Sequence, residues 1–265
     1  TVWKTWSTPG LSFPNGAALI RSGSRQYICC ANWNGNSALA VPLPIVIDPR
    51  GPFNLYYADR FQPGETHHQH PSPQPVHHFI DNSVLSSKTF DRPADVCSIS
   101  FSPDTPGGLA VCDFYGGAVH LYSCPAPHAS IFSDPYGGAS TEARQPLAPL
   151  FSIKPNPSKR RALERPSAIA VDTTRAHRHA SQPTLRLLVA ESGKMCISVF
   201  ELREARPAAG LTRQTRYAHI CDIGCGQLGT GVHQPLRSRW SWLGLAVTEA
   251  GDVLVADMDR SCVYR

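Results

Sequence analysis

The sequence predicts an all-β protein, and three observations carry that prediction. The chain of 265 residues has 24 prolines, 20 glycines and only 17% charged residues, and no long window shows the 3.6-residue apolar period of an amphipathic helix. Its apolar runs, such as IAVD, LRLLVA and DVLVAD, are short and bounded by Gly, Pro, Asp or Ser, which is typical of strands. These runs recur in one pattern, which indicates a repeat protein.

Each copy of the repeat begins with a strand that ends near Asp and continues, after a turn, into a second strand that ends in Ala and an acidic residue. A short turn and a third strand complete the copy. The five copies, in chain order, are residues 13–43, 43–61 (compressed), 92–122, 165–200 and 242–265. The runs HASIFSDPYGG and PLAPLFSIKPNP, between residues 122 and 165, are either a sixth, degenerate copy or an insertion.

These copies resemble the NHL repeat, a family of β-propellers, most specifically at residues 166–172 with 188–200 and at 244–265. The resemblance implies a single propeller over residues 1–265, with six blades when the degenerate copy is counted. One small sheet cannot bury its apolar face alone, so blades pack around an axis until the ring closes. Segments outside the repeats are expected to be surface insertions, at about residues 62–91, 123–164, 173–184 and 201–219.

The last copy supplies three strands and no fourth. Because propellers commonly join the two chain ends within one blade, the first residues, TVWKTWSTPG, are expected to provide the missing outer strand. The closing strands are predicted at Val2, Trp3 and Trp6 and at Cys262, Val263 and Tyr264.

Acidic residues recur at the strand ends of the repeat, at Asp59, Asp113, Asp172, Glu191 and Asp257. Carboxylates in such turns accept backbone N–H bonds and stabilise the bend, so these residues are predicted to be structural. No set of unlike metal ligands is expected to converge on one blade edge, and no GxSxG, HExxH or GxxxxGK[ST] motif occurs. The sequence therefore predicts no catalytic residues and no cofactor.

A Pro-rich segment, QPGETHHQHPSPQPVHH, concentrates histidines, and neutral imidazole is a common ligand of zinc and copper. The segment lacks cysteine, and its prolines break the helix that would align ligands, so a polar loop is the favoured interpretation. The weak metal candidates are His67, His68, His70, His77 and His78.

Basic residues gather in KPNPSKRRALER and TTRAHRHASQPT. Such clusters neutralise phosphates or pair with an acidic protein surface. A solvated linker is the alternative, because no aromatic residues interleave to stack on bases. The candidate partner-binding residues are Lys154, Lys159, Arg160, Arg161, Arg165, Arg175 and Arg178.

The nine cysteines are odd in number and lie mostly in apolar runs such as YICCA and LAVCDF. This favours reduced core thiols over a disulfide framework, and hence an intracellular, reducing compartment, whether cytoplasmic, ciliary or organellar. No stretch approaches the roughly 18 to 20 apolar residues of a membrane span.

Repeats without a catalytic set, together with large insertions, favour a non-catalytic scaffold that binds other proteins through its loops, as a subunit of a larger assembly. One alternative is RNA binding through a basic loop face, since the formal net charge is +5. A second alternative is a metal-dependent propeller hydrolase or lyase. No small-molecule substrate is evident from the sequence.

Overall fold

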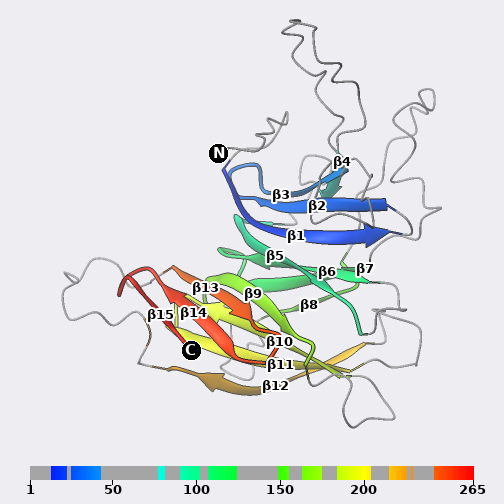
Figure 1. The fold of residues 1–265 in the computed structure, drawn as a ribbon. Coiled ribbons are helices and arrows are strands. Elements are labelled where there is room, and N and C mark those ends of the chain that lie inside the picture. The colour runs from blue at the N-terminus through cyan, green and yellow to red at the C-terminus, as the bar shows by residue number, and fades with distance from the viewer. Residues whose placement is uncertain are drawn as a thin grey trace, which may run out of the picture.

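The computed structural model describes residues 13–22, 25–42, 77–80, 90–101, 107–123, 149–154, 163–174, 184–203, 215–225, 228 and 242–265. All regular secondary structure in these segments is β-strand (Figure 1), which confirms the predicted class. In none of them does a helix reach the length and apolar character that crossing a membrane requires.

The described strands form four antiparallel sheets. The first contains β1 (Pro14–Ser22), β2 (Arg25–Asn32), β3 (Ser37–Pro42) and β4 (His77–Ile80). The second contains β5 (Pro93–Ile99), β6 (Gly108–Asp113), β7 (Ala118–Ser123) and β8 (Phe151–Ile153). The third contains β9 (Pro166–Asp172), β10 (Thr184–Glu191), β11 (Cys196–Arg203) and β12 (Arg216–Ile223). The fourth contains β13 (Leu243–Val247), β14 (Val253–Asp257) and β15 (Cys262–Tyr264).

Four of the five predicted copies supply the first three strands of one sheet each. The compressed copy at residues 43–61 lies outside the described residues. The fourth strands β4 and β8 come from segments predicted to be insertions, and β12 begins in the predicted insertion 201–219 and runs four residues past it. Because β8 pairs with β7, the described part of PLAPLFSIKPNP belongs to the second sheet, and its assignment to a sixth copy is wrong.

The first strands of successive sheets lie side by side, so that β1 contacts β5, β5 contacts β9, and β9 contacts β13 (Figure 1). Propeller blades follow one another around an axis in this order. Within the described residues, β15 is the outer strand of a three-stranded sheet. Its predicted partners Val2, Trp3 and Trp6 lie outside those residues, so ring closure and the number of blades stay predictions.

The core consists of apolar layers between neighbouring sheets. On β10, Leu187 and Val189 pack toward the second sheet, whereas Leu188 and Ala190 pack toward the fourth. Side chains alternate between the two faces of a strand, and both faces of β10 are covered. This explains why LRLLVA reads as a nearly continuous apolar run.

An aromatic cluster joins three of the sheets. Trp33 lies in the turn after β2, Phe114 in the turn after β6, and Trp242 directly before β13. The ring centroids of Trp33 and Phe114 are 5.2 Å apart, and each lies 5.4 Å from Trp242. The rings of Phe114 and Trp242 are stacked, with 20° between their planes. The cluster links sheets that are far apart in the sequence.

The four first strands together line a hollow of about 450 Å³. Asp95 of β5 lies here, and its carboxylate accepts hydrogen bonds from the backbone N–H of Val96 at 2.8 Å and of Ile169 in β9 at 2.9 Å. A Cβ atom on Gly16 of β1 would lie 1.7 Å from Asp95 Oδ1 and 2.6 Å from its Cα. Glycine is therefore required where β1 passes β5.

Candidate functional site

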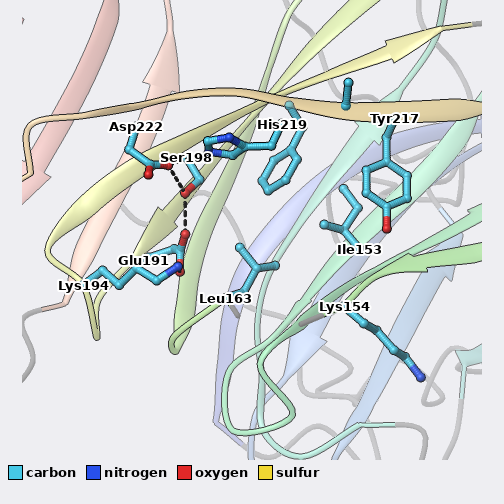
Figure 2. Close-up of a pocket in the computed structure, with 11 residues that line it drawn as sticks. Ile153, Lys154, Leu163, Glu191, Lys194, Ser198, Tyr217, His219 and Asp222 are labelled. Atoms are coloured by element: carbon cyan, nitrogen blue, oxygen red, sulfur yellow. Dashed lines mark hydrogen bonds and ion pairs between the residues drawn. The ribbon is translucent and has the colours of Figure 1, made fainter. Parts of the chain in front are cut away.

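A polar cluster lies on the face of the third sheet that looks toward the second sheet (Figure 2). Strand register builds it: Glu191 at the end of β10 is opposite Cys196 at the start of β11, and Ser198 of β11 is opposite Asp222 of β12. Residues two apart on a strand share a face, so Cys196 and Ser198 point to the same side. His219 of β12 joins them through Asp222.

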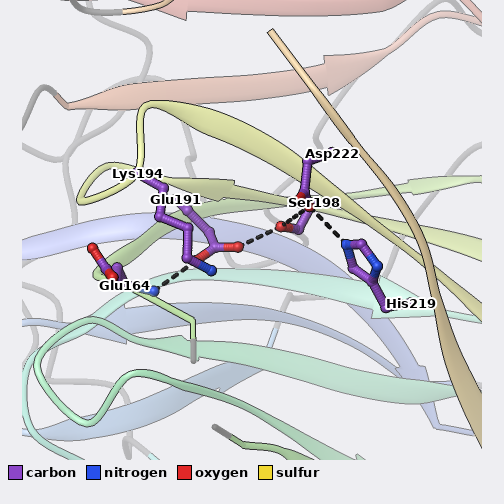
Figure 3. A network of polar contacts seen from close by, with 6 residues as sticks. All are labelled: Glu164, Glu191, Lys194, Ser198, His219 and Asp222. Carbon is purple, nitrogen blue, oxygen red and sulfur yellow. Dashed lines mark hydrogen bonds and ion pairs between the residues drawn. The ribbon is translucent and has the colours of Figure 1, made fainter. Parts of the chain in front are cut away.

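Glu191 is fully buried and has three partners (Figure 3). Its Oε2 accepts the backbone N–H of Glu164 at 2.6 Å and lies 2.8 Å from Nζ of Lys194. Its Oε1 accepts a hydrogen bond from the hydroxyl of Ser198. Hydrogen bonds and a paired cation offset the cost of burying this charge.

Asp222 is more exposed than Glu191 and faces it across Ser198 (Figure 3). Its Oδ1 lies 2.8 Å from the Ser198 hydroxyl and 2.6 Å from Nε2 of His219. Partial burial opposes ionisation, but hydrogen bonds from His219 and Ser198 outweigh it and hold the pKa of Asp222 below its ordinary value.

Ser198 contacts one carboxylate oxygen on each side, at Glu191 and at Asp222. A hydroxyl carries one proton and donates it to one acceptor at a time. One of the two oxygen–oxygen contacts therefore has no hydrogen between its atoms, unless a proton or a cation is added. The Ser198 hydroxyl therefore has two carboxylate acceptors for one proton.

Cys196 brings a thiol to the same place. Single donor atoms of Glu191, Cys196 and Asp222 all lie within 4.8 Å of one another, and the Cys225 thiol interacts with that of Cys196. Burial raises the pKa of the Cys196 thiol to about 12, with further contributions from Glu191, Cys225 and Asp222. The expectation that unlike ligands do not converge on one blade edge is therefore wrong.

A cavity of about 690 Å³ opens beside the polar cluster, between β8 and the faces of β11 and β12 (Figure 2). Its apolar lining includes Ile153 and Leu163, and Lys154 lies at its border. Tyr217 forms part of the wall, and its ring stacks on Phe151 with centroids 5.8 Å apart and 6° between the planes. The cavity thus combines an apolar wall with charged groups.

The hydrogen bonds of the cluster do not follow the serine–histidine–carboxylate order of a serine nucleophile site. In such sites a histidine accepts the serine proton, and a carboxylate orients that histidine. Ser198 instead contacts Glu191 and Asp222, and His219 contacts the same Asp222 oxygen. The serine proton already goes to a carboxylate, so this arrangement does not favour acyl transfer.

The predicted turn carboxylates Asp113, Asp172 and Asp257 all accept hydrogen bonds from backbone N–H groups. Asp113 accepts the N–H of Asp91 at 2.7 Å and of Gly116 at 3.2 Å. Asp257 accepts the N–H of Asp259 at 3.1 Å and of Arg260 at 3.2 Å. Asp172 accepts the backbone N–H and the hydroxyl of Thr174, at 2.9 and 2.6 Å. Asp59 lies outside the described residues.

The predicted loop sites lie mostly outside the described residues. Lys154 borders the cavity beside the cluster, and Arg165 lines a second hollow next to Phe114. His77 and His78 open strand β4 and pair with β3. The remaining candidates outside the described residues are Lys159, Arg160, Arg161, Arg175, Arg178, His67, His68 and His70.

Eight of the nine cysteines lie in the described segments, and all eight are free thiols. Cys29, Cys112 and Cys196 are buried, as predicted for core thiols. Cys221, Cys225 and Cys262 are exposed and so are not core thiols.

Strand β12 forms a long, exposed sheet edge. Tyr217, Ile220 and Ile223 are 42%, 47% and 46% exposed, and no described strand pairs with the outer side of β12. The other fourth strands are short, with four residues in β4 and three in β8, against eight in β12. Short edges limit pairing with other chains, whereas long apolar edges promote it.

A scan against models of protein families, a search of curated proteins and a search of solved structures each found no match to this chain. The resemblance to the NHL repeat therefore rests on the sequence motifs alone.

Proposed function

We propose that this protein is a non-catalytic scaffold that binds another protein by adding a strand of the partner to the outer edge of β12. The observation that supports the proposal is the length of β12 together with its exposed apolar side chains. An added strand satisfies the backbone groups of the edge, and its alternate side chains pack on those of β12.

The side chains of β12 indicate the chemistry of the partner segment. Tyr217, Ile220 and Ile223 present apolar surface, and the neighbouring strand β11 is buried along most of its length. The partner segment is therefore an extended strand with apolar side chains and without proline at its pairing positions. Binding of this kind is consistent with the prediction from the sequence that the repeats contain no catalytic residues.

The substitution Ile220→Lys tests this function. We expect it to reduce the amount of co-purifying partner at least tenfold, because a charge on an edge strand opposes the addition of another strand. The measurement is purification of the tagged protein from cells that express it natively, followed by quantitative mass spectrometry. Since Ile220 is exposed, its replacement is expected to change the free energy of unfolding by less than about 0.5 kcal/mol.

Met258→Lys is the matched control, because Met258 is also an exposed apolar residue but lies in the turn after β14. It is expected to retain the partner. Nuclease treatment separates the RNA-binding alternative, since a protein complex survives it. A monomer without a stable partner, or a partner held equally by the Ile220→Lys variant, would contradict the proposal.

A further inference from the structure

The polar cluster brings two carboxylates and two thiols together on one face of the third sheet, and this arrangement points to a bound cation. Ser198 has one proton for two carboxylates, and a second thiol, Cys225, interacts with Cys196. We propose that Glu191, Cys196, Asp222 and Cys225 form a binding site for one divalent transition metal ion, best matched by zinc.

The donor atoms are close to coordinating positions. Zinc binds thiolate sulfur at about 2.3 Å and carboxylate oxygen at about 2.0 to 2.2 Å, so two ligand atoms on one tetrahedral ion lie at most about 3.8 Å apart. The donors of Glu191, Cys196 and Asp222 already lie within 4.8 Å of one another. These three residues could therefore close around one ion by small side-chain adjustments, and Cys225, which interacts with Cys196, would supply the fourth ligand.

The donor set selects the type of metal. Thiolates favour zinc and copper(I) over magnesium and calcium, which prefer all-oxygen sites. Two thiolates and two carboxylates give the borderline-soft, four-coordinate environment that zinc accepts. Zinc binding would release the thiol protons of its cysteine ligands, and the ion would then attract the thiolates and the two carboxylates together.

The surrounding groups act as supports for the ligands. The backbone N–H of Glu164 fixes one oxygen of Glu191, and His219 fixes one oxygen of Asp222. Hydrogen-bonded carboxylates of this kind are common around metal sites. Lys194 occupies the cation position beside Glu191, but its side chain is 28% exposed. It can swing into solvent when the metal binds.

The metal would join three parts of the third sheet. Glu191 ends β10, Cys196 begins β11, and Asp222 and Cys225 lie at the end of β12 and directly after it. Coordination would hold the C-terminal end of β12 against the buried strands. This inference is independent of the proposed partner, since metal binding is measured on the isolated protein.

The test uses the purified, reduced protein after removal of metal by a chelator, with Zn²⁺ and Co²⁺ as probes. We expect one Zn²⁺ to bind per chain by calorimetry and to raise the unfolding temperature. Bound Co²⁺ is expected to show a thiolate charge-transfer absorption band. Asp222→Asn and Cys225→Ser are each expected to weaken Zn²⁺ binding at least about tenfold, which is the effect of losing even an outer-shell partner.

Both substitutions affect exposed residues, so the variants are expected to fold, and circular dichroism checks this. Cys221→Ser is the matched control, because Cys221 is an exposed thiol on the same strand outside the cluster; it should bind Zn²⁺ as the wild-type protein does. The inference is overturned if the Co²⁺ complex lacks the thiolate band, or if Cys225→Ser and Asp222→Asn bind Zn²⁺ as tightly as the wild type.

Discussion

Replacing Trp242 with alanine is expected to lower the free energy of unfolding by about 3 kcal/mol, at the lower end of the range for large aromatic residues because Trp242 is half-buried. Its ring contacts Trp33 of the first sheet and Phe114 of the second. The substitution removes apolar area together with two aromatic contacts between sheets, each of which contributes about 0.5 to 1.5 kcal/mol beyond that area. Urea denaturation followed by circular dichroism measures the loss.

Tyr115→Ala is the control for this prediction. Tyr115 belongs to the same cluster, with its ring 6.0 Å from Trp33, but its side chain is 55% exposed. Its loss is expected to cost about 1 kcal/mol, because most of its surface already contacts water. A loss below 1 kcal/mol for Trp242→Ala would show that the fourth sheet is not held through this cluster. Trp242→Phe is expected to restore about half of the lost free energy, since it keeps one ring.

The sequence predicts the strands that have a buried face and misses those that have none. All first, second and third strands of the four described sheets begin within predicted copies, and only the last residues of β7 and β11 run past them, because apolar residues mark these strands and turn residues bound them. Strand β12 is exposed at seven of its eight positions, so it has no buried face to reveal it. Its only cue is the run RYAHICDI before a glycine. Strand β8 has three residues, which is too few for periodicity.

The polar cluster was not predictable from residue patterns, because strand register creates it. Glu191 fits the turn position of the repeat, and its bond from the Glu164 N–H agrees with that role. Nothing near it in the sequence indicates that Asp222 shares its face. That proximity depends on the pairing of β11 with β12 and on the bulge between Val199 and Phe200. A strand whose existence is missed cannot contribute a ligand to a predicted site.

The carboxyl of Asp95 is expected to make the protein less stable as the pH rises from about 4 to about 6. Burial raises the pKa of Asp95 from 3.8 to about 6, although hydrogen bonds from Ile169 and Val96 oppose the shift. Between these values the folded state binds more protons than the unfolded state, so stability falls with increasing pH. This shift in pKa corresponds to about 3 kcal/mol in the free energy of unfolding. The protein has this contribution at low pH and has lost it fully above pH 6.

The pH dependence of Asp95→Asn isolates this contribution, because asparagine does not titrate. Free energies of unfolding are measured for both proteins by urea denaturation at intervals between pH 4 and 7. The wild type is expected to lose about 3 kcal/mol relative to the variant across this range. The asparagine amide has one acceptor oxygen, so it cannot accept both N–H groups as the carboxylate does, and the variant is expected to have a different stability at every pH. The readout is therefore the difference between the two proteins in the slope of unfolding free energy against pH.

Asp252→Asn provides the matched control, since Asp252 is a partly exposed carboxylate paired with Arg265 at the surface. It should reproduce the wild-type slope between pH 4 and 6. Parallel curves for the wild type and Asp95→Asn would mean that water or a counter-ion reaches Asp95 in the hollow. The hollow between strands β1, β5, β9 and β13 would then be hydrated, because a carboxyl in contact with water ionises near its ordinary pKa of about 4.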